Sequence, residues 1–213
     1  MSGDEPNDPG AAPPRAPQVT SPPLLLELRR ALAARERDTM VLPGFRRAAV
    51  LVPLLDAPGG LEVLFTVRSS RLANHAGQIA FPGGRVDPGE TPADAARRET
   101  FEEIGVAVPE GALLGTLHDH PSPAAYIVTP IVGVLPWPQP LAVNATEVEE
   151  VFAVPLAELA ALTPRSETRV LEHFSRVIHF YTWQRRLIWG MTGNILKDLL
   201  DTLRELGAFG GAT

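Results

Sequence analysis

Glu99, Glu102 and Glu103 are the residues of this chain whose types and spacing most directly indicate chemistry. Their i, i+3 and i+4 spacing places the three carboxylates on one face of a helix, with Cβ atoms about 5–6 Å apart. Acidic groups near a helix C-terminus lose roughly 0.3–1 kcal/mol each to the helix dipole, and like charges at this spacing also repel. A hard divalent cation such as Mg²⁺ would remove both penalties, because it binds carboxylate oxygens and takes its remaining ligands from water and substrate phosphates.

The helix that carries these glutamates is predicted at residues 92–104. Thr91 is a good N-cap, Pro92 suits the first helical position, and Asp94 completes the spacing of a capping box. Gly105 ends the helix, since glycine is the preferred residue just beyond a helix C-terminus.

Two further features surround the helix. Arg98 lies four residues after Asp94 and four before Glu102, so it can pair with either and hold the acidic face in shape. The preceding segment, residues 81–89, is too rich in Gly and Pro for a regular element. We therefore expect it to form a loop that folds over the start of the helix.

Together these residues resemble the Nudix box of the Nudix hydrolases. The match consists of Gly84, five residues, Glu90, seven residues and then the run RETFEEIGV over residues 98–106. Thr100 departs from the pattern, because the family usually has an aliphatic residue there, and this departure bears on packing more than on chemistry. The alternative is a solvated acidic helix with a Gly-rich lead-in, which would require all these spacings to coincide by chance.

The resemblance implies that the three box glutamates hold Mg²⁺ or Mn²⁺ and that Arg98 orients them through ion pairs without touching substrate. Many Nudix enzymes also supply an extra glutamate opposite the box, and residues 144–151 (NATEVEEV) resemble the segment that does so. Glu147 is the candidate and Glu150 the second choice. The alternative for this segment is a solvated acidic run, because glutamates are seldom buried without a partner.

A second stretch, residues 64–84 (LFTVRSSRLANHAGQIAFPGG), resembles the extended motif that precedes the box in coenzyme A pyrophosphatases of the Nudix superfamily. Its polar side chains can donate hydrogen bonds beside the metal loop, and arginine suits bidentate recognition of phosphate. Coenzyme A carries a diphosphate and a ribose 3′-phosphate, so it needs more than one cationic contact. The alternatives are solvated arginines at a strand end and a histidine and glutamine that only shape a turn. The candidate substrate-binding residues are Arg68, Arg71, His75, Gln78, Gly83 and Gly84.

The implied reaction is metal-dependent hydrolysis of the pyrophosphate bond of coenzyme A and its derivatives to 3′,5′-ADP and 4′-phosphopantetheine. One rival is a Nudix hydrolase acting on another nucleoside diphosphate derivative, such as ADP-ribose, NADH or an oxidised nucleotide. A second rival is a nucleotide-sensing Nudix domain without turnover, which the presence of every box glutamate disfavours. The sequence leaves open the form of coenzyme A, the general base and the oligomeric state.

The length, composition and net charge of the chain agree with an enzyme acting on a small molecule. At 213 residues and 45% hydrophobic residues, the chain can bury a good core. Its formal net charge of −6 argues against a nucleic-acid surface, and the absence of cysteine excludes disulfides and thiolate sites. Without a recognisable secretory signal or a long apolar run, a cytoplasmic protein that does not enter membranes is the default expectation.

Four regions are predicted along the chain: a disordered Pro-rich tail (1–23), an amphipathic helix (24–39), a Nudix hydrolase domain (40–207) and a C-terminal tail (208–213). Within the domain, Pro53 indicates a strand edge or a bulge. Strands alternating with helices indicate an α/β protein, and the resemblance implies the Nudix α/β/α sandwich with a mixed β-sheet. Further strands are expected at 46–55, 61–68, 113–119, 126–135, 147–154, 176–184 and 187–189, and helices at 155–162 and 192–206.

Overall fold

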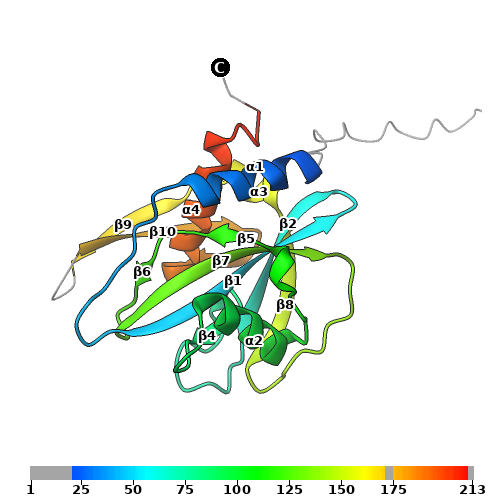
Figure 1. The fold of residues 1–213 in the computed structure, drawn as a ribbon. Helices are drawn as coiled ribbons and strands as arrows, with labels where there is room; N and C mark the ends of the chain where they lie inside the picture. The colour runs from blue at the N-terminus through cyan, green and yellow to red at the C-terminus, as the bar shows by residue number, and fades with distance from the viewer. Residues whose placement is uncertain (1–20, 171–174, 211–213) are drawn as a thin grey trace, which may run out of the picture.

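The computed structural model describes residues 21–170 and 175–210, and a mixed sheet of eight strands lies at its centre (Figure 1). The strands are β1 (Arg46–Ala57), β2 (Gly60–Arg68), β3 (Ile79–Ala80), β4 (Gly83–Arg85), β5 (Leu113–Thr116), β6 (His120–Pro121), β7 (Tyr126–Pro136) and β8 (Val148–Pro155). They run in the order β3-β2-β1-β7-β5, with β4 beside β1, β6 beside β7 and β8 beside β2. β1 and β7 are parallel, and the remaining pairs are antiparallel.

A smaller antiparallel sheet and the helices complete the fold. The second sheet has the order β11-β10-β9, from β9 (Arg165–Val170), β10 (Ser175–Trp183) and β11 (Arg186–Trp189). The helices are α1 (Ser21–Ala34), α2 (Pro92–Ile104), α3 (Leu156–Ala161) and α4 (Gly190–Glu205), with a short 3₁₀ turn at Glu110–Ala112. β9 is not among the predicted strands, because its sequence RSETRV is mostly polar.

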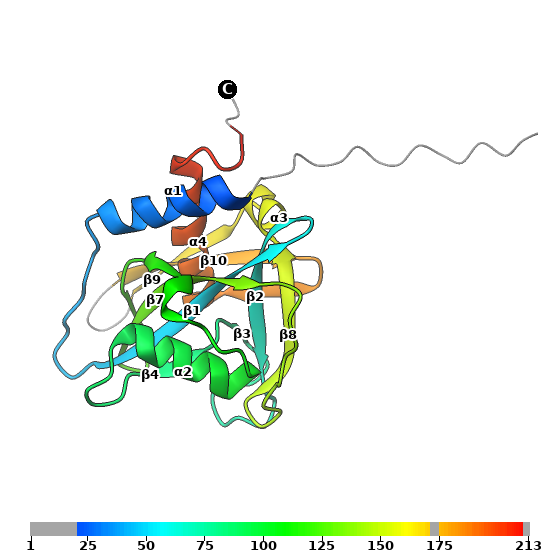
Figure 2. The ribbon, with the colours of Figure 1, turned by 45° about the vertical axis from the view of Figure 1, so that its right-hand side comes forward.

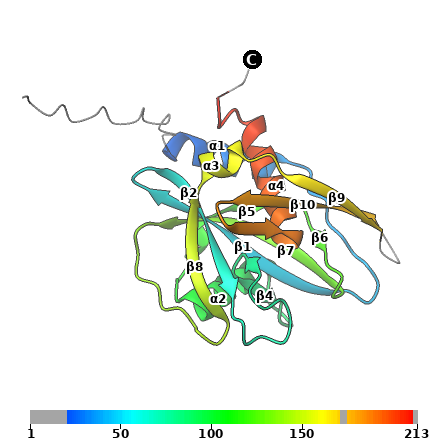
Figure 3. The ribbon, with the colours of Figure 1, turned by 180° about the vertical axis from the view of Figure 1, so that it is seen from behind.

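Helices cover both faces of the large sheet. On one face, α2 buries Ala95, Ala96 and Ile104 against Ala49 and Leu51 of β1. On the other face, the leucines of α1 and α4 form a larger core with β2, and the small sheet adds Tyr181 and Ile188 to this core. Figures 2 and 3 show α2 on one side of the sheet and α4 with the small sheet on the other. This arrangement confirms the predicted α/β/α sandwich with a mixed sheet.

The bounds of α2 are those that the sequence predicts. The Thr91 hydroxyl accepts a hydrogen bond from the Asp94 N–H at 3.1 Å, and Pro92 occupies the first turn. At the other end, Gly105 adopts φ 73° and donates its N–H to the Phe101 carbonyl. A Cβ at Gly105 would lie 2.5 Å from the Cβ of Ala142, so glycine serves both the left-handed conformation and the close approach of the next loop.

The expectation of a loop without regular structure over residues 81–89 is wrong at β4, which pairs with Ala48–Val50 of β1. A Cβ at Gly83 would lie 2.3 Å from the Ala49 carbonyl oxygen, so only glycine permits this approach. Pro53 also departs from expectation, because it lies inside β1 and not at a sheet edge. On one side of β1 the partner changes from β4 to β2 around Pro53, so its missing N–H removes no bond from either ladder.

The two ends of the chain refine the predicted boundaries. α1 spans Ser21–Ala34, so the helix predicted at 24–39 begins three residues too late and ends five residues too late. The earlier start is possible because prolines are tolerated in a first helical turn, whose N–H groups have no partners. At the C-terminus, Ala208 and Phe209 pack against the core, so this part of the predicted tail belongs to the folded body. The disordered tail predicted at 1–23 is wrong at residues 21–23, which belong to α1, and its residues 1–20 lie outside the described residues.

Candidate active site

Four charged side chains from three parts of the chain meet at one end of the sheet. α2 supplies Glu99 and Glu103, β2 ends at Arg68, and the segment before β8 supplies Glu147. The Glu147 carboxylate acts electrostatically on both glutamates of α2, and Arg68 acts on Glu103. The structure therefore brings together three predicted catalytic residues and one predicted substrate-binding residue.

Glu103 is the most unusual of these groups, because its carboxylate is buried with only 4% of the residue exposed. Burial, together with the negative charge of Glu99, raises its pKa to about 8. The opposing influences of Arg68 and of a hydrogen bond with the Gly83 backbone are smaller. Burial also raises the pKa of Glu99, against the lowering influence of Arg98. The local positive charge thus does not compensate for the buried carboxylates.

Arg98 holds the acidic face through several contacts. Its guanidinium donates to both carboxylate oxygens of Glu90, at 2.9 and 3.0 Å, and to Glu99 at 2.9 Å. It also reaches Glu102 at 3.2 Å and the Arg85 carbonyl at 3.0 Å. Hydrogen bonding to Glu90 is the main cause that raises the pKa of Arg98. The predicted partner Asp94 is wrong, and Glu90 in the loop takes that place.

Glu102 differs from its two neighbours because its side chain is 51% exposed and bonded to Arg98. Within residues 21–170 and 175–210, no three His, Asp or Glu side chains are arranged so that they could hold a metal ion together. The ion pair with Arg98 holds Glu102 apart from the buried carboxylates of Glu99 and Glu103.

The predicted glycines lie against the same glutamates. A Cβ on Gly84 would stand 2.3 Å from Glu99 Oε1, so this position tolerates no side chain while Glu99 keeps its place. Gly83 is hydrogen-bonded through its backbone to Glu103. The missing side chain of Gly84 therefore lets β4 pass close to Glu99 of α2, whereas the missing side chain of Gly83 lets β4 approach β1.

The remaining predicted substrate residues lie on a turn that leaves and re-enters the sheet. The Arg68 N–H donates to the Gln78 carbonyl, and the Gly77 N–H donates to the Arg68 carbonyl, both at 2.9 Å. His75 and Gln78 contact each other through Nδ1 and Oε1 at 2.9 Å, and Arg71 is exposed. The Nε atom of Arg68 is buried and has no hydrogen-bond partner among the described residues, so Arg68 is the group of this turn best placed to take a ligand.

Glu147 and Glu150, the two candidates opposite the box, have different surroundings. The Glu147 carbonyl accepts the Ser69 N–H at 2.8 Å, which places this residue beside the turn that follows Arg68. Glu150 pairs instead with Arg186, at 2.6 and 2.9 Å, and this pairing lowers its pKa. Geometry therefore favours Glu147 over Glu150.

Two features near the site are visible only in the structure. Thr100 is fully buried and donates its hydroxyl to the Ala96 carbonyl at 2.6 Å, so the residue that departs from the family pattern packs without an unsatisfied group. Glu90 belongs to the box, but the sequence alone does not predict that it is the bidentate partner of Arg98. The spacing of eight residues, which crosses from a loop into a helix, gives no periodic signal for this pair.

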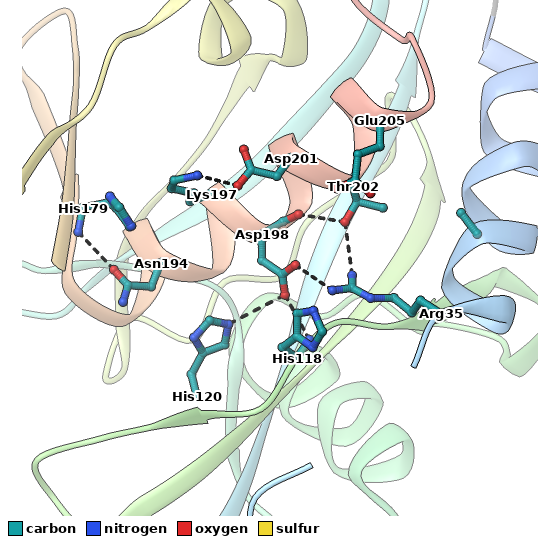
Figure 4. A pocket seen from close by; sticks show the side chains of 11 residues that line it. Arg35, His118, His120, His179, Asn194, Lys197, Asp198, Asp201, Thr202 and Glu205 are labelled. Carbon is teal, nitrogen blue, oxygen red and sulfur yellow. Dashed lines mark hydrogen bonds and ion pairs between the residues drawn. The ribbon is translucent and has the colours of Figure 1, made fainter. Parts of the chain in front are cut away.

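A cavity of about 560 Å³ lies apart from this cluster, between α1, α4 and the segment that joins β5 to β6 (Figure 4). Its charged groups are largely paired with one another: Arg35 contacts Asp198 at 3.0 Å, and Lys197 contacts Asp201. None of the predicted site residues lines this cavity.

Comparison with known proteins identifies the fold and the box together. The NUDIX domain family matches residues 45–174, which include β1 to β9 and α2. The chain belongs to the Nudix family of hydrolases. As a Nudix hydrolase it carries its box glutamates on α2, which follows β4 and the loop that contains Glu90.

Relatives of this Nudix chain include a coenzyme A enzyme. The mitochondrial coenzyme A diphosphatase of Homo sapiens is 40% identical over 188 residues, which cover 84% of this chain and 77% of the relative. An uncharacterised Nudix hydrolase, NudL, of Photorhabdus laumondii is 40% identical over 161 residues, covering 75% and 86% of the two chains. The crystal structure of a MutT/nudix family protein from Enterococcus faecalis shares the fold, with a TM-score of 0.52 at 16% identity over 84% of this chain and 68% of that one.

Proposed function

We propose that this Nudix hydrolase cleaves the pyrophosphate bond of coenzyme A and its derivatives, giving 3′,5′-ADP and 4′-phosphopantetheine. The observation that carries the proposal is the position of Arg68, the first cationic residue of the coenzyme A motif, beside the buried Glu103 of the box. A phosphate-binding arginine and the acidic cluster thus face the same substrate group. The 40% identity to a coenzyme A diphosphatase supports this substrate.

The acidic cluster fits a hard divalent cation, Mg²⁺ or Mn²⁺. Burial, and to a smaller extent neighbouring carboxylates, raise the pKa values of Glu99 and Glu103, so a cation beside them would stabilise their ionised forms. Glu102 can join them by leaving Arg98. These three residues would hold the ion, which when bound neutralises the diphosphate and acidifies a water molecule.

The other residues take roles that follow from their contacts. Arg68 would donate to the diphosphate through its Nε, which has no partner in the part of the chain that the structure describes, and Arg71, exposed on the same turn, would donate to the ribose 3′-phosphate. Glu147 would accept the proton of the attacking water, because its carboxylate acts on both α2 glutamates and has no arginine partner in the described residues. Arg98 keeps the glutamates oriented and stays away from substrate.

The test is to incubate the protein with coenzyme A, ADP-ribose, NADH and an oxidised nucleotide, each with Mg²⁺ or Mn²⁺, and to identify products by mass. We expect 3′,5′-ADP and 4′-phosphopantetheine from coenzyme A as the fastest reaction. Faster cleavage of ADP-ribose or NADH would overturn the proposed substrate, and no cleavage of any compound would overturn the proposed activity.

The role of the box is tested by substitution. Glu103→Gln should lower turnover about a thousandfold, whereas Glu167→Gln on exposed β9 should behave as wild type.

A cytoplasmic location is part of this proposal and rests on the sequence alone. In the described part of the chain, every helix is too short or too polar to cross a membrane.

A further inference from the structure

The segment between β7 and β8 is bonded directly to the end of the catalytic helix. The N–H of Asn144 donates to the carbonyl of Glu103, and the N–H of Ala142 donates to the carbonyl of Ile104, both at 2.9 Å. The last carbonyls of a helix have no partner within it, so these bonds satisfy two groups that would otherwise need water. They also fix Asn144 relative to Glu103 through the backbone.

Asn144 is in turn hydrogen-bonded to Glu147, three positions later. Its carbonyl accepts the N–H groups of Glu147 at 3.0 Å and of Val148 at 2.9 Å. Its side-chain oxygen accepts the N–H of Thr146 at 3.1 Å and the Thr146 hydroxyl at 2.6 Å. Because a backbone N–H can only donate, the amide oxygen must face Thr146, and this assigns the orientation of the amide. The Nδ2 group therefore points to Glu147 and lies 3.4 Å from its Oε1.

We propose that Asn144 is a positioning residue for catalysis, which links the backbone of Glu103 to the carboxylate of Glu147 and keeps that carboxylate facing the box. The inference deepens the proposed function, since it rests on Glu147 acting at the box. No arginine, lysine or histidine bond to Glu147 is present in the described residues, so the amide of Asn144 is what steers its side chain.

The test is a double-mutant cycle of Asn144→Asp with Glu147→Gln. Aspartate keeps the oxygen that bonds Thr146 and every backbone bond, but it replaces the Nδ2 donor with an acceptor. We expect N144D to lower kcat roughly ten- to a hundredfold, as loss of an orienting partner does elsewhere, with KM changed less than about twofold. In the Glu147→Gln background the same change should cost less than about twofold, because its effect passes through Glu147.

Thr146→Val is the matched control, since it removes the hydroxyl bond to Asn144 and leaves the Nδ2 group in place; we expect near wild-type kcat. Should N144D fail to fold, Asn144→Ser enters the same cycle, because it also lacks the donor. An equal loss of kcat in both backgrounds, or no loss in the wild-type background, would overturn the inference. The cycle uses whichever compound of the panel wild type cleaves fastest, so a failure on coenzyme A refutes the substrate proposal and leaves this test intact.

Discussion

At the scale of single residues, Glu103 is a buried carboxyl group whose ionised form is not stabilised by its surroundings. The carboxylate lies against Glu99 and within reach of Glu147, and Arg68 lowers its pKa less than burial and Glu99 raise it. In the metal-free protein the group therefore holds its proton at neutral pH, and a cation must displace that proton to bind. This makes proton release and metal binding parts of one equilibrium.

The first prediction concerns the stability of the metal-free protein. The pKa of Glu103 is about 8 when folded, above its ordinary value of 4.5, so the folded state keeps a proton that the unfolded state loses. The contribution of Glu103 to stability is therefore highest below pH 4.5 and falls as pH rises towards 8, by at most about 1.4 kcal/mol per pH unit. Denaturant unfolding in a chelator at several pH values measures this slope. Glu103→Gln should flatten it, and an unchanged slope in that variant would contradict the burial of the carboxylate charge.

A second prediction at this scale separates binding from chemistry at Arg68. Its Nε is buried and has no hydrogen-bond partner within residues 21–170 and 175–210, so substrate phosphate is the ligand expected there. Arg68→Gln should raise KM for coenzyme A by about tenfold or more, a loss typical of a charge-assisted contact, and should change kcat less. Steady-state kinetics with Arg169→Gln on exposed β9 as the control checks this. A KM equal to that of wild type would show that the arginine only supports its turn.

At the scale of elements, α2 and β4 show what a sequence can and cannot predict. The bounds of α2 are predictable because each signal is local: Thr91 caps one end and Gly105 terminates the other. The strand character of β4 is not, because two glycines and an arginine form a strand only where β1 exposes a free edge. The pairing of Arg98 with Glu90 is equally invisible, since it depends on how the loop folds back over the helix.

The close approach of β4 to α2 yields a third prediction. Gly84 has a backbone conformation that alanine can adopt, but a Cβ there would stand 2.3 Å from Glu99 Oε1. Gly84→Ala should therefore displace Glu99 and lower kcat by about tenfold or more, since small misplacements of catalytic groups are costly. Gly59→Ala is the matched control, because an added Cβ meets nothing within 4 Å. Equal kcat values for the two variants would mean that Glu99 can shift without loss.

At the scale of the whole molecule, a polar network joins the segment after α1 to the sheet. Asp119 is buried, and its carboxylate accepts hydrogen bonds from the Met40 N–H, the Arg47 guanidinium and the Thr129 hydroxyl. The Arg47 guanidinium also donates to the Met40 carbonyl at 2.9 Å. Residues from two distant parts of the sequence, 40–47 and 119–129, thus share one carboxylate, and α1 stays docked on the sheet partly through it.

This network gives the last prediction. Asp119→Ala removes the acceptor of the Met40 N–H and of the Thr129 hydroxyl, and it removes the charge that compensates Arg47, whose side chain is 37% exposed. We expect the free energy of unfolding to fall by about 3 kcal/mol, the low end for breaking a buried pair, because Arg47 can still reach water. Denaturant titration measures the change. Asp38→Asn is the control, since Asp38 joins the neighbouring contacts mainly through its backbone. Its N–H donates to Nδ1 of His118, and its carbonyl accepts the N–H of Asp119. Equal destabilisation by the two substitutions would show that the linker is held by its backbone bonds and that the buried carboxylate adds nothing to the docking of α1.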